Sequence, residues 1–328
     1  MRDYIVAVVG ATGLVGNTIL KVLEERSFPI KRLLPLASER SAGKFVHFQG
    51  ERIPVKVLTK NSFRGVDFAF FAAGGSVSKA FVPYAVKSGA MVIDNSSEFR
   101  MDPEVPLIVP EVNGEDVLFE KGIIANPNCS TIQCMSALYC IQEVAGLKRI
   151  VYSSYQSCSG SGMKGLRDLD EGRYEFYPYP IRGNILPHID AFLDNGYTKE
   201  EMKMINETKK ILHDDDLKIT ATTARVPVRF SHCVSINVET EKDFDLEKIR
   251  QKMDDFPELV LWDEPARNKY PLPLQVEGRD EVYVGRIRRD ESLEHGLNLW
   301  TVADNIRKGA ATNAVEIGLE CIKRGVVE

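Results

Sequence analysis

Residues 4–16 read YIVAVVGATGLVG, and this stretch decides the fold class. The apolar run Tyr4–Val9 has the length and the β-branched content of a buried strand. It leads into a loop with glycines at positions 10, 13 and 16, and a helical pattern follows over Asn17–Arg26. Glycines at such a turn let backbone N–H groups approach a pyrophosphate at the helix N-terminus. The stretch therefore predicts a dinucleotide-binding loop, with a purely structural turn as the alternative.

The same alternation of strand and helix continues to about residue 130. A helix is predicted over Val77–Lys87, and the strand-like runs are Lys31–Ala37, Asp67–Ala72, Met91–Asp94 and Ile123–Ala125. Strands that alternate with helices indicate βαβ units and a parallel sheet. We therefore expect an α/β domain in this part of the chain.

After residue 146 the pattern changes to strands with longer and uneven connections. Helices are expected at about 199–212 and 245–254, and a last helix over Asp304–Arg324. The strand-like runs are Arg149–Gln156, Lys218–Val228, Val234–Thr240 and Glu281–Arg288. This order predicts an α+β domain around a mostly antiparallel or mixed sheet.

Length and charge exclude several classes of protein. The chain of 328 residues is long enough for about two domains. Its 42 basic and 47 acidic residues give a net charge of −5, which argues against a nucleic-acid partner. No apolar run reaches the roughly 18–20 residues of a membrane helix, and the N-terminal apolar run ends in a glycine loop, not a cleavage site. We therefore expect a cytoplasmic protein with no membrane partner.

One of the six cysteines lies where thiol chemistry is favoured. None of the six forms a CxxC pair or has zinc-ligand spacing to histidine, so no metal site is expected. Cys129 follows Asn128 and precedes Ser130, which are natural capping residues for a helix that begins near Cys129. A thiol at a helix N-terminus has a lowered pKa, because the helix dipole stabilises the thiolate. Cys129 is therefore a candidate nucleophile, and a capping cysteine without chemistry is the alternative.

A nucleophilic thiol usually needs a base, and His232 is the candidate among the five histidines. It follows the strand-like run Thr223–Val228, which contains Arg225 and Pro227, through the short polar turn Arg229–Ser231. The spacing of seven would put Arg225 and His232 on opposite faces of an uninterrupted strand. The proline and the polar turn could redirect the chain so that both side chains face one pocket. Structural packing of a lone histidine is the alternative.

The segment SERSAG, residues 38–43, follows the second predicted strand, where dinucleotide-binding domains distinguish their cofactors. An acidic residue there favours NAD and an arginine favours NADP, and the segment contains both Glu39 and Arg40. Arg40, with the hydroxyls of Ser38 and Ser41 nearby, could bind a 2′-phosphate while Glu39 points to water. The segment favours NADP, and a solvated turn is the alternative.

Nine segments that occur in order along nearly the whole chain resemble the aspartate-β-semialdehyde dehydrogenase family: GATGLVG, SERSAG, DNSSEFR, NPNCSTIQ, SYQSCSGSG, MINETKKI, ARVPVRFSH, VGRIRRD and NIRKGAATNA. No single segment decides the resemblance. It implies an α/β fold with a Rossmann-type parallel-sheet NADP-binding domain and an α+β catalytic and dimerisation domain of the semialdehyde dehydrogenase type. It also implies that residues 1–129 and 305–328 form the first domain and residues 130–304 the second.

The resemblance assigns roles by position. Cys129 would be the nucleophile, His232 the general acid/base, and Gln156 the residue that positions the acyl-enzyme. The substrate would be bound by Asn128, by Arg225 at its α-carboxylate, by Glu207 at its α-ammonium group, and by Arg100 and Lys210 at its phosphate. Taken without the resemblance, Glu207 and Lys210 would form a surface ion pair on one helix face, and Arg100 would be an ordinary exposed side chain.

The resemblance also implies two sets of cofactor contacts. The set for the pyrophosphate, the 2′-phosphate and the adenosine comprises Gly10, Thr12, Gly13, Leu14, Val15, Ser38, Arg40, Ser41, Ala73 and Gly74. The set for the nicotinamide comprises Ser159, Gly160, Asn305 and Asn313. The last helix would then return to the first domain.

The implied reaction is the NADPH-dependent reductive dephosphorylation of L-4-aspartyl phosphate to L-aspartate 4-semialdehyde, a step toward lysine, threonine and methionine. An N-acetyl-γ-glutamyl-phosphate reductase is the closest alternative, and Glu207 disfavours it because an N-acetyl group needs no carboxylate partner. An NADP-binding sensor without turnover is a second alternative. A cysteine hydrolase would leave the glycine loop unexplained. The resemblance further implies a homodimer, or a tetramer formed from two such dimers.

Overall fold

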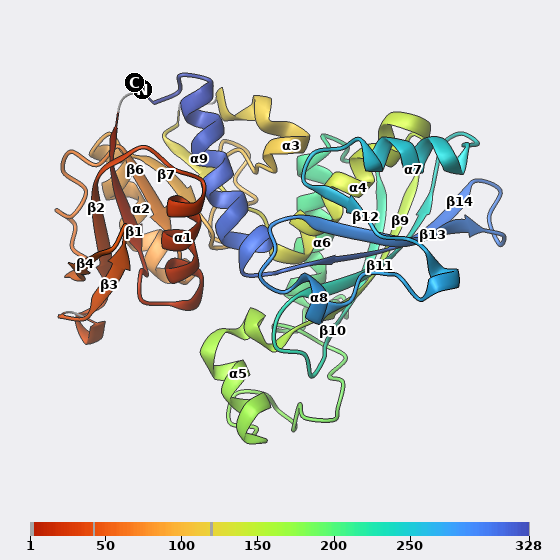
Figure 1. Ribbon diagram of the computed structural model, residues 1–328, viewed down its shortest axis with the longest axis horizontal. Coiled ribbons are helices and arrows are strands. Elements are labelled where there is room, and N and C mark those ends of the chain that lie inside the picture. Colours follow the sequence, from red (N-terminus) through yellow and green to blue (C-terminus); the bar gives the residue numbers. More distant parts are fainter. Residues whose placement is uncertain (1–2, 42, 119–120, 328) are drawn as a thin grey trace. The chain divides into compact units, whose positions relative to one another are not determined.

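The computed structural model describes residues 3–41, 43–118 and 121–327, and the chain divides into two compact units (Figure 1). One unit comprises Met1–Pro127 and Ala310–Glu328, and the other comprises Asn128–Gly309. The boundaries between the units therefore lie after Pro127 and after Gly309. The sequence resemblance placed these boundaries after residue 129 and before residue 305. Each unit has its own six-stranded sheet.

The sheet of the first unit is parallel throughout, as the alternation of strands and helices predicted. Its strands, in spatial order, are β5 (Lys56–Val57), β2 (Ile30–Ala37), β1 (Tyr4–Val9), β6 (Phe68–Phe71), β7 (Met91–Asp94) and β8 (Ile123–Ala125). The strands that follow β1 in the chain are added on both of its sides. In open parallel sheets, ligands bind at the carboxyl ends of the strands where the order reverses in this way.

Helices from both ends of the chain complete the first unit. They are α1 (Leu14–Glu25), α2 (Gly75–Lys87), α3 (Pro110–Asn113) and α9 (Asn313–Lys323). Short 3₁₀ turns lie at Glu39–Ser41 and Gly114–Leu118. Helix α9 packs against α1 and β7 (Figure 1).

The sequence did not predict the hairpin of β3 (Phe45–Phe48) and β4 (Glu51–Pro54). The core of this unit contains Phe28, Phe68 and Phe70. The ring of Phe28 packs edge to face against the rings of Phe68 and Phe70, with centroid distances of 5.4 and 5.8 Å.

Two glycines allow the turn from β1 into α1. Gly10 has a φ of +83°, a conformation that a residue with a side chain rarely adopts. A Cβ at Gly16 would lie only 2.2 Å from the carbonyl oxygen of Gly10. Helix α1 can therefore begin at Leu14, directly under the loop, whereas the sequence placed its start at Asn17.

The sheet of the second unit is mixed, as predicted. Its strands, in spatial order, are β10 (Lys218–Arg225), β9 (Arg149–Gln156), β11 (His232–Glu239), β14 (Gly296–Ala303), β13 (Val282–Asp290) and β12 (Leu259–Leu261). The outer pairs β10–β9 and β12–β13 are parallel, and the pairs between them are antiparallel. The sequence did not predict β12 and β14.

The longer helices that pack against this sheet are α4 (Cys129–Ala145), α6 (Lys199–Ile211) and α7 (Leu246–Asp254). Helix α4 lies between α6 and α7, which explains why it is apolar on nearly all sides. The remaining helices are α5 (Gly162–Glu171), α8 (Pro273–Val276) and the 3₁₀ turns at Cys158–Ser161 and Pro265–Arg267. In the part of the chain that the structure describes, no helix has the length and apolar character to cross a membrane.

The C-terminal helix differs from its prediction. The sequence predicted one helix over Asp304–Arg324, but a π-helical segment, Arg307–Thr312, precedes α9. The carboxylate of Asp304 accepts hydrogen bonds from the backbone N–H groups of Ile306 and Arg307, so the chain turns before the helix begins. Periodicity alone does not distinguish a π-turn from the first turn of an α-helix.

The contact between Gly16 and Gly10 predicts a loss of stability when a methyl group is added. We expect Gly16→Ala to lower the free energy of unfolding by about 2 kcal/mol, equivalent to about 4–8 °C in Tm. Gly74→Ala is the matched control, because Gly74 has an ordinary φ of −70° and open space around its Cβ position. Scanning calorimetry measures both, and equal Tm values for the two variants would contradict the prediction.

Candidate active site

One edge of the second unit's sheet brings together three residues that the sequence singled out: Gln156, Arg225 and His232. In the parallel pair β9–β10, Gln156 lies opposite Arg225, so both strands end at this edge. Strand β11 runs antiparallel to β9 and begins there with His232. The turn between Arg225 and His232 does redirect the chain: a Cβ at Gly160 would lie 2.9 Å from Nη1 of Arg225 and 3.2 Å from Nε2 of His232. Both side chains therefore face the space beside Gly160.

Ser157 connects these residues, and the sequence analysis missed it. Its backbone N–H donates to Nδ1 of His232 at 3.0 Å, and its carbonyl oxygen accepts from Nη1 of Arg225 at 2.6 Å. Its hydroxyl donates to Oδ1 of Asn305 at 2.9 Å. The one signal in the sequence is its position directly after Gln156, at the end of a predicted strand.

The hydrogen bond from Ser157 defines the protonation state of His232. Because Nδ1 accepts an N–H, the neutral ring carries its proton on Nε2. His232 is fully buried, and its Nε2 has no hydrogen-bond partner among the described residues. Burial, and then the charge of Arg225, hold the pKa of His232 well below its ordinary value of 6.5. The ring is thus a neutral proton donor aimed into the site.

Helix α4 begins at Cys129, as predicted, and Asn128 is its N-cap. The side-chain oxygen of Asn128 accepts from the backbone N–H groups of Ser130 at 2.9 Å and Thr131 at 3.4 Å. Cys129 is partly exposed, whereas the other five cysteines are buried. A Cβ at Gly309 would lie 2.8 Å from Cβ of Cys129, so the glycine leaves room for the thiol-bearing residue.

The charged residues assigned to the substrate are more buried than their sequence suggested. Glu207 is only 1% exposed and accepts a 2.6 Å hydrogen bond from the backbone N–H of Asn128. The interpretation of Glu207 as a surface residue is therefore wrong. Lys210, on the same helix, is half-buried. Arg100, in the first unit, is 7% exposed and donates to the carbonyl oxygen of Asn95, so it is not an ordinary exposed side chain either.

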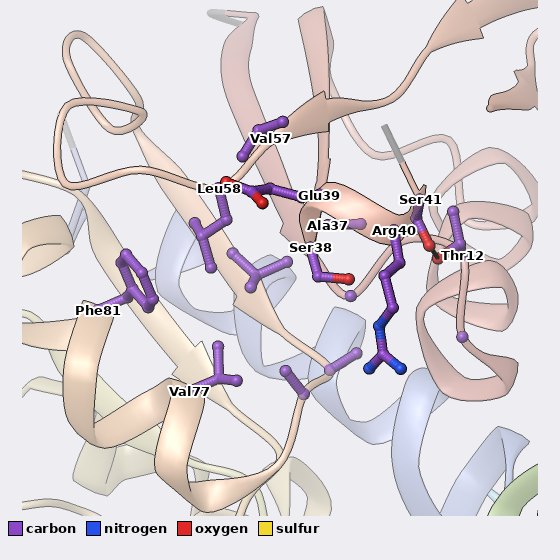
Figure 2. A pocket seen from close by; sticks show the side chains of 15 residues that line it. Thr12, Ala37, Ser38, Glu39, Arg40, Ser41, Val57, Leu58, Val77 and Phe81 are labelled. Carbon is purple, nitrogen blue, oxygen red and sulfur yellow. Dashed lines mark hydrogen bonds between the residues drawn. The ribbon is translucent and has the colours of Figure 1, made fainter. Parts of the chain in front are cut away.

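A pocket of about 540 Å³ lies at the carboxyl ends of β1 and β2 in the first unit (Figure 2). It brings together seven of the residues predicted for the cofactor: Gly10, Thr12, Gly13, Ser38, Arg40, Ser41 and Ala73. The hydroxyl of Thr12 donates to that of Ser41 at 3.2 Å. Figure 2 shows the Arg40 side chain extending beside Ser38, with Glu39 turned toward Leu58.

The other predicted cofactor residues lie elsewhere. Leu14 and Val15 begin α1, and Gly74 caps α2, outside the lining of the pocket. Asn313 is buried in the first unit and donates to the side chain of Asn126 at 2.6 Å. The apolar part of the lining was missed by the sequence analysis and includes Val57, Leu58, Val77 and Phe81. These residues reach the pocket only through tertiary packing, so no local pattern marks them.

Two residues predicted for the nicotinamide meet in the second unit. The hydroxyl of Ser159 donates to Oδ1 of Asn305 at 3.0 Å, and the backbone N–H of Ser231 donates to the same oxygen. The Nδ2 atom of Asn305 is buried and has no partner among the described residues. It is therefore a donor held ready for a group that enters the site.

Comparison with known proteins shows the family to which both units belong. Residues 5–118 match the family described as "Semialdehyde dehydrogenase, NAD binding domain", and residues 138–308 match "Semialdehyde dehydrogenase, dimerisation domain". The aspartate-semialdehyde dehydrogenase of Aquifex aeolicus is 54% identical over 99% of both chains, and that of Bacillus subtilis is 47% identical over 98% of both. The chain belongs to the aspartate-semialdehyde dehydrogenase family. This confirms the family, and with it the fold class, that the nine sequence segments indicated.

A solved structure from this family extends the agreement to the fold. Aspartate semialdehyde dehydrogenase II of Vibrio cholerae, "complexed with ASA", superposes with a TM-score of 0.95 at 42% identity, covering 98% of this chain and 99% of its own. These relatives support the aspartate-semialdehyde dehydrogenase among the activities considered from the sequence, rather than the alternatives.

The lowered pKa of His232 predicts a proton uptake on acid unfolding. Below a pH of about 6.5 this histidine becomes protonated in the unfolded chain but not in the folded chain. The free energy of unfolding therefore decreases as the pH is lowered, by up to about 1.4 kcal/mol per pH unit. His232→Gln keeps an acceptor for the Ser157 N–H but removes the titration. The Tm of the wild type should fall more steeply between pH 7 and 5 than that of the variant. Parallel curves would contradict the prediction.

Proposed function

We propose that this protein catalyses the NADPH-dependent conversion of L-4-aspartyl phosphate to L-aspartate 4-semialdehyde and phosphate, in either direction. The observation that carries the proposal is the buried neutral His232, whose unpaired Nε2–H shares one sheet edge with Arg225 and Gln156. Family membership supports the reaction, which supplies amino-acid biosynthesis.

Buried charges of both signs match the two charged ends of an amino acid. Arg225 presents a guanidinium, 5% exposed, for the α-carboxylate, a task that suits its planar fork. The buried carboxylate of Glu207 suits a free α-ammonium group, which an N-acetylated substrate lacks. Arg100 and Lys210 are proposed for the phosphate, and Asn128 as a further substrate contact.

In the first half of the reaction, the Cys129 thiolate attacks the acyl-phosphate carbon. The bond from that carbon to the phosphate oxygen breaks, phosphate leaves with the electron pair, and a thioester on Cys129 remains. The N-terminus of α4, the positive end of its helix dipole, favours the negative charge that develops on the carbonyl oxygen. Gln156 holds the acyl group in place.

In the second half, His232 supplies and recovers one proton. NADPH, when bound, supplies the hydride that reduces the thioester carbon. Nε2–H of His232 donates its proton to the oxygen of the resulting thiohemiacetal. The C–S bond then breaks, the thiolate of Cys129 is restored, and the proton returns to Nε2 as the aldehyde leaves.

The residues present fit a phosphorylated dinucleotide. The positive φ of Gly10 and the space kept by Gly16 expose backbone at the start of α1, which suits a pyrophosphate. Arg40, with Ser38 and Ser41 beside it, offers a charge and two hydroxyls to a 2′-phosphate. Ser159, Gly160 and Asn305 are proposed for the nicotinamide, as are Leu14, Val15, Gly74 and Asn313 for further cofactor contacts.

We also infer a cytoplasmic homodimer. The segment from α5 to α6 exposes a run of large apolar side chains: Tyr174, Phe176, Tyr179, Ile185 and Phe192. Monomeric proteins rarely leave so many together in water. The family's dimerisation domain covers this segment, and the pairing of dimers into a tetramer stays a prediction of the sequence resemblance.

The covalent mechanism predicts distinct losses for its two central residues. Cys129→Ala should abolish turnover, and His232→Ala should retain a trace, with kcat lowered about 10²–10⁴-fold. Cys140→Ala, which removes a buried thiol of the same helix, is the control and should retain activity. The assay follows NADPH absorbance during phosphate-dependent oxidation of aspartate semialdehyde by NADP. N-acetylglutamate semialdehyde runs in parallel, and a signal with that aldehyde alone would overturn the substrate assignment.

The proposed 2′-phosphate contact predicts a selective loss of NADPH affinity. Arg40→Ala should raise KM for NADPH about 10- to 100-fold, because it removes a charge-assisted hydrogen bond. KM for NADH, which lacks the 2′-phosphate, should change little. Arg64→Ala is the control, since Arg64 is an exposed arginine of the same unit outside the pocket lining. An equal rise with both cofactors would contradict the assignment.

A further inference from the structure

Helix α6 begins with two adjacent buried carboxylates, and only one of them has a structural explanation. Glu201, 7% exposed, forms the capping box of the helix with Thr198 and also accepts from the backbone N–H of Thr223 at 3.0 Å. Glu200, 5% exposed, takes no part in the capping box. Burial of a carboxylate costs several kcal/mol unless it is well paired, so its partners indicate what it does.

Two of the partners of Glu200 are the side-chain amides of Asn128 and Gln156, both of which the sequence assigned to the site. Its Oε1 atom accepts from Nδ2 of Asn128 at 2.9 Å and from Nε2 of Gln156 at 3.2 Å. Its Oε2 atom accepts from Nζ of Lys203 at 3.1 Å. Asn128 caps the helix that begins at Cys129, and Gln156 ends the strand next to Arg225.

We propose that Glu200 is a positioning residue for the reaction proposed above, because it fixes the orientation of two carboxamides, that of Asn128, which precedes Cys129, and that of Gln156. A carboxylate only accepts hydrogen bonds, so both amides must turn their NH₂ groups toward it. The oxygen of Asn128 is thereby left to cap α4. Nε2 of Gln156 also donates to the hydroxyl of Ser154 at 3.2 Å, so the nitrogen is held toward Glu200 and Ser154 and the amide oxygen is left for other partners.

Lys203 keeps Glu200 in the accepting, ionised form. Burial alone would raise the pKa of Glu200, but the charge of Lys203 and the hydrogen bonds from Asn128, Lys203 and Gln156 outweigh it and lower the pKa. Lys203 in turn donates to Oδ2 of Asp190 at 2.9 Å. The chain of charges Asp190–Lys203–Glu200 therefore runs from an exposed aspartate to the two amides that Glu200 accepts from.

Glu200→Gln tests this role with little change of shape. The new amide can turn either its oxygen or its NH₂ group toward Asn128 and Gln156, so neither carboxamide is held in one orientation. We expect kcat to fall about 10- to 100-fold, with KM for aspartate semialdehyde within about threefold of the wild type. The matched control is Glu201→Gln, which alters a buried carboxylate of the same helix end and should lower Tm while kcat stays within about twofold.

A double-mutant cycle separates positioning from general destabilisation. If Glu200 acts in large part through Gln156, then Glu200→Gln should lower kcat by a markedly smaller factor in a Gln156→Leu background than in the wild type. An equal factor in both backgrounds, or a wild-type kcat in Glu200→Gln, would overturn the proposal.

The rate at which iodoacetamide alkylates Cys129, measured by mass spectrometry, tests the same role without turnover. This rate should change in Glu200→Gln but not in Glu201→Gln, because only Glu200 holds the cap of α4. An unchanged rate in both variants counts against the proposal. If the wild type shows no turnover with aspartate semialdehyde, the proposed function fails, and the alkylation rates still decide the role of Glu200.

Discussion

The peptide groups on either side of Ser157 are the constraint on which the second unit's site depends. Gln156 is the last residue of β9, and the chain leaves the sheet there. The free N–H and C=O of the next residue would be costly to bury without partners, and His232 and Arg225 provide those partners. One backbone position thus fixes the tautomer of the histidine, the direction of the arginine and, through the hydroxyl, the amide of Asn305.

Pairing with oriented backbone and amide groups is also what allows charged side chains to be buried in this unit. Arg225, Glu200 and Glu207 are each at most 5% exposed, and each has lost most of its contact with water. Backbone groups and amides replace that water: a carbonyl for Arg225, and the Asn128 N–H and Nδ2 for the two glutamates. Polar groups already oriented in this way need not reorganise when charge develops on a substrate. Such preorganised groups are usually the largest source of transition-state stabilisation in catalytic sites. The same groups stabilise the fold less than apolar packing would.

Glycines leave the space that these side chains need. A Cβ at Gly160 would collide with Arg225, and one at Gly309 would collide with Cys129. In the first unit, Gly16 allows α1 to start directly beneath the loop. In all three places the missing side chain makes room for backbone or a reactive group, so each glycine is required by packing and not by local secondary structure.

The sequence by itself determined the elements whose signals are local. The run from Tyr4 to Gly16 specifies strand, loop and helix, and the residues around Cys129 specify a helix start, because both depend on neighbours a few positions away. Tertiary structure alone decided that Ser157 joins His232 to Arg225 and that Glu200 binds two amides that are 72 and 44 residues away in the chain. It also decided strand β14, which pairs with β11 and β13. These features arise from pairing between distant segments, and the free energy that selects them appears only once the sheet has assembled.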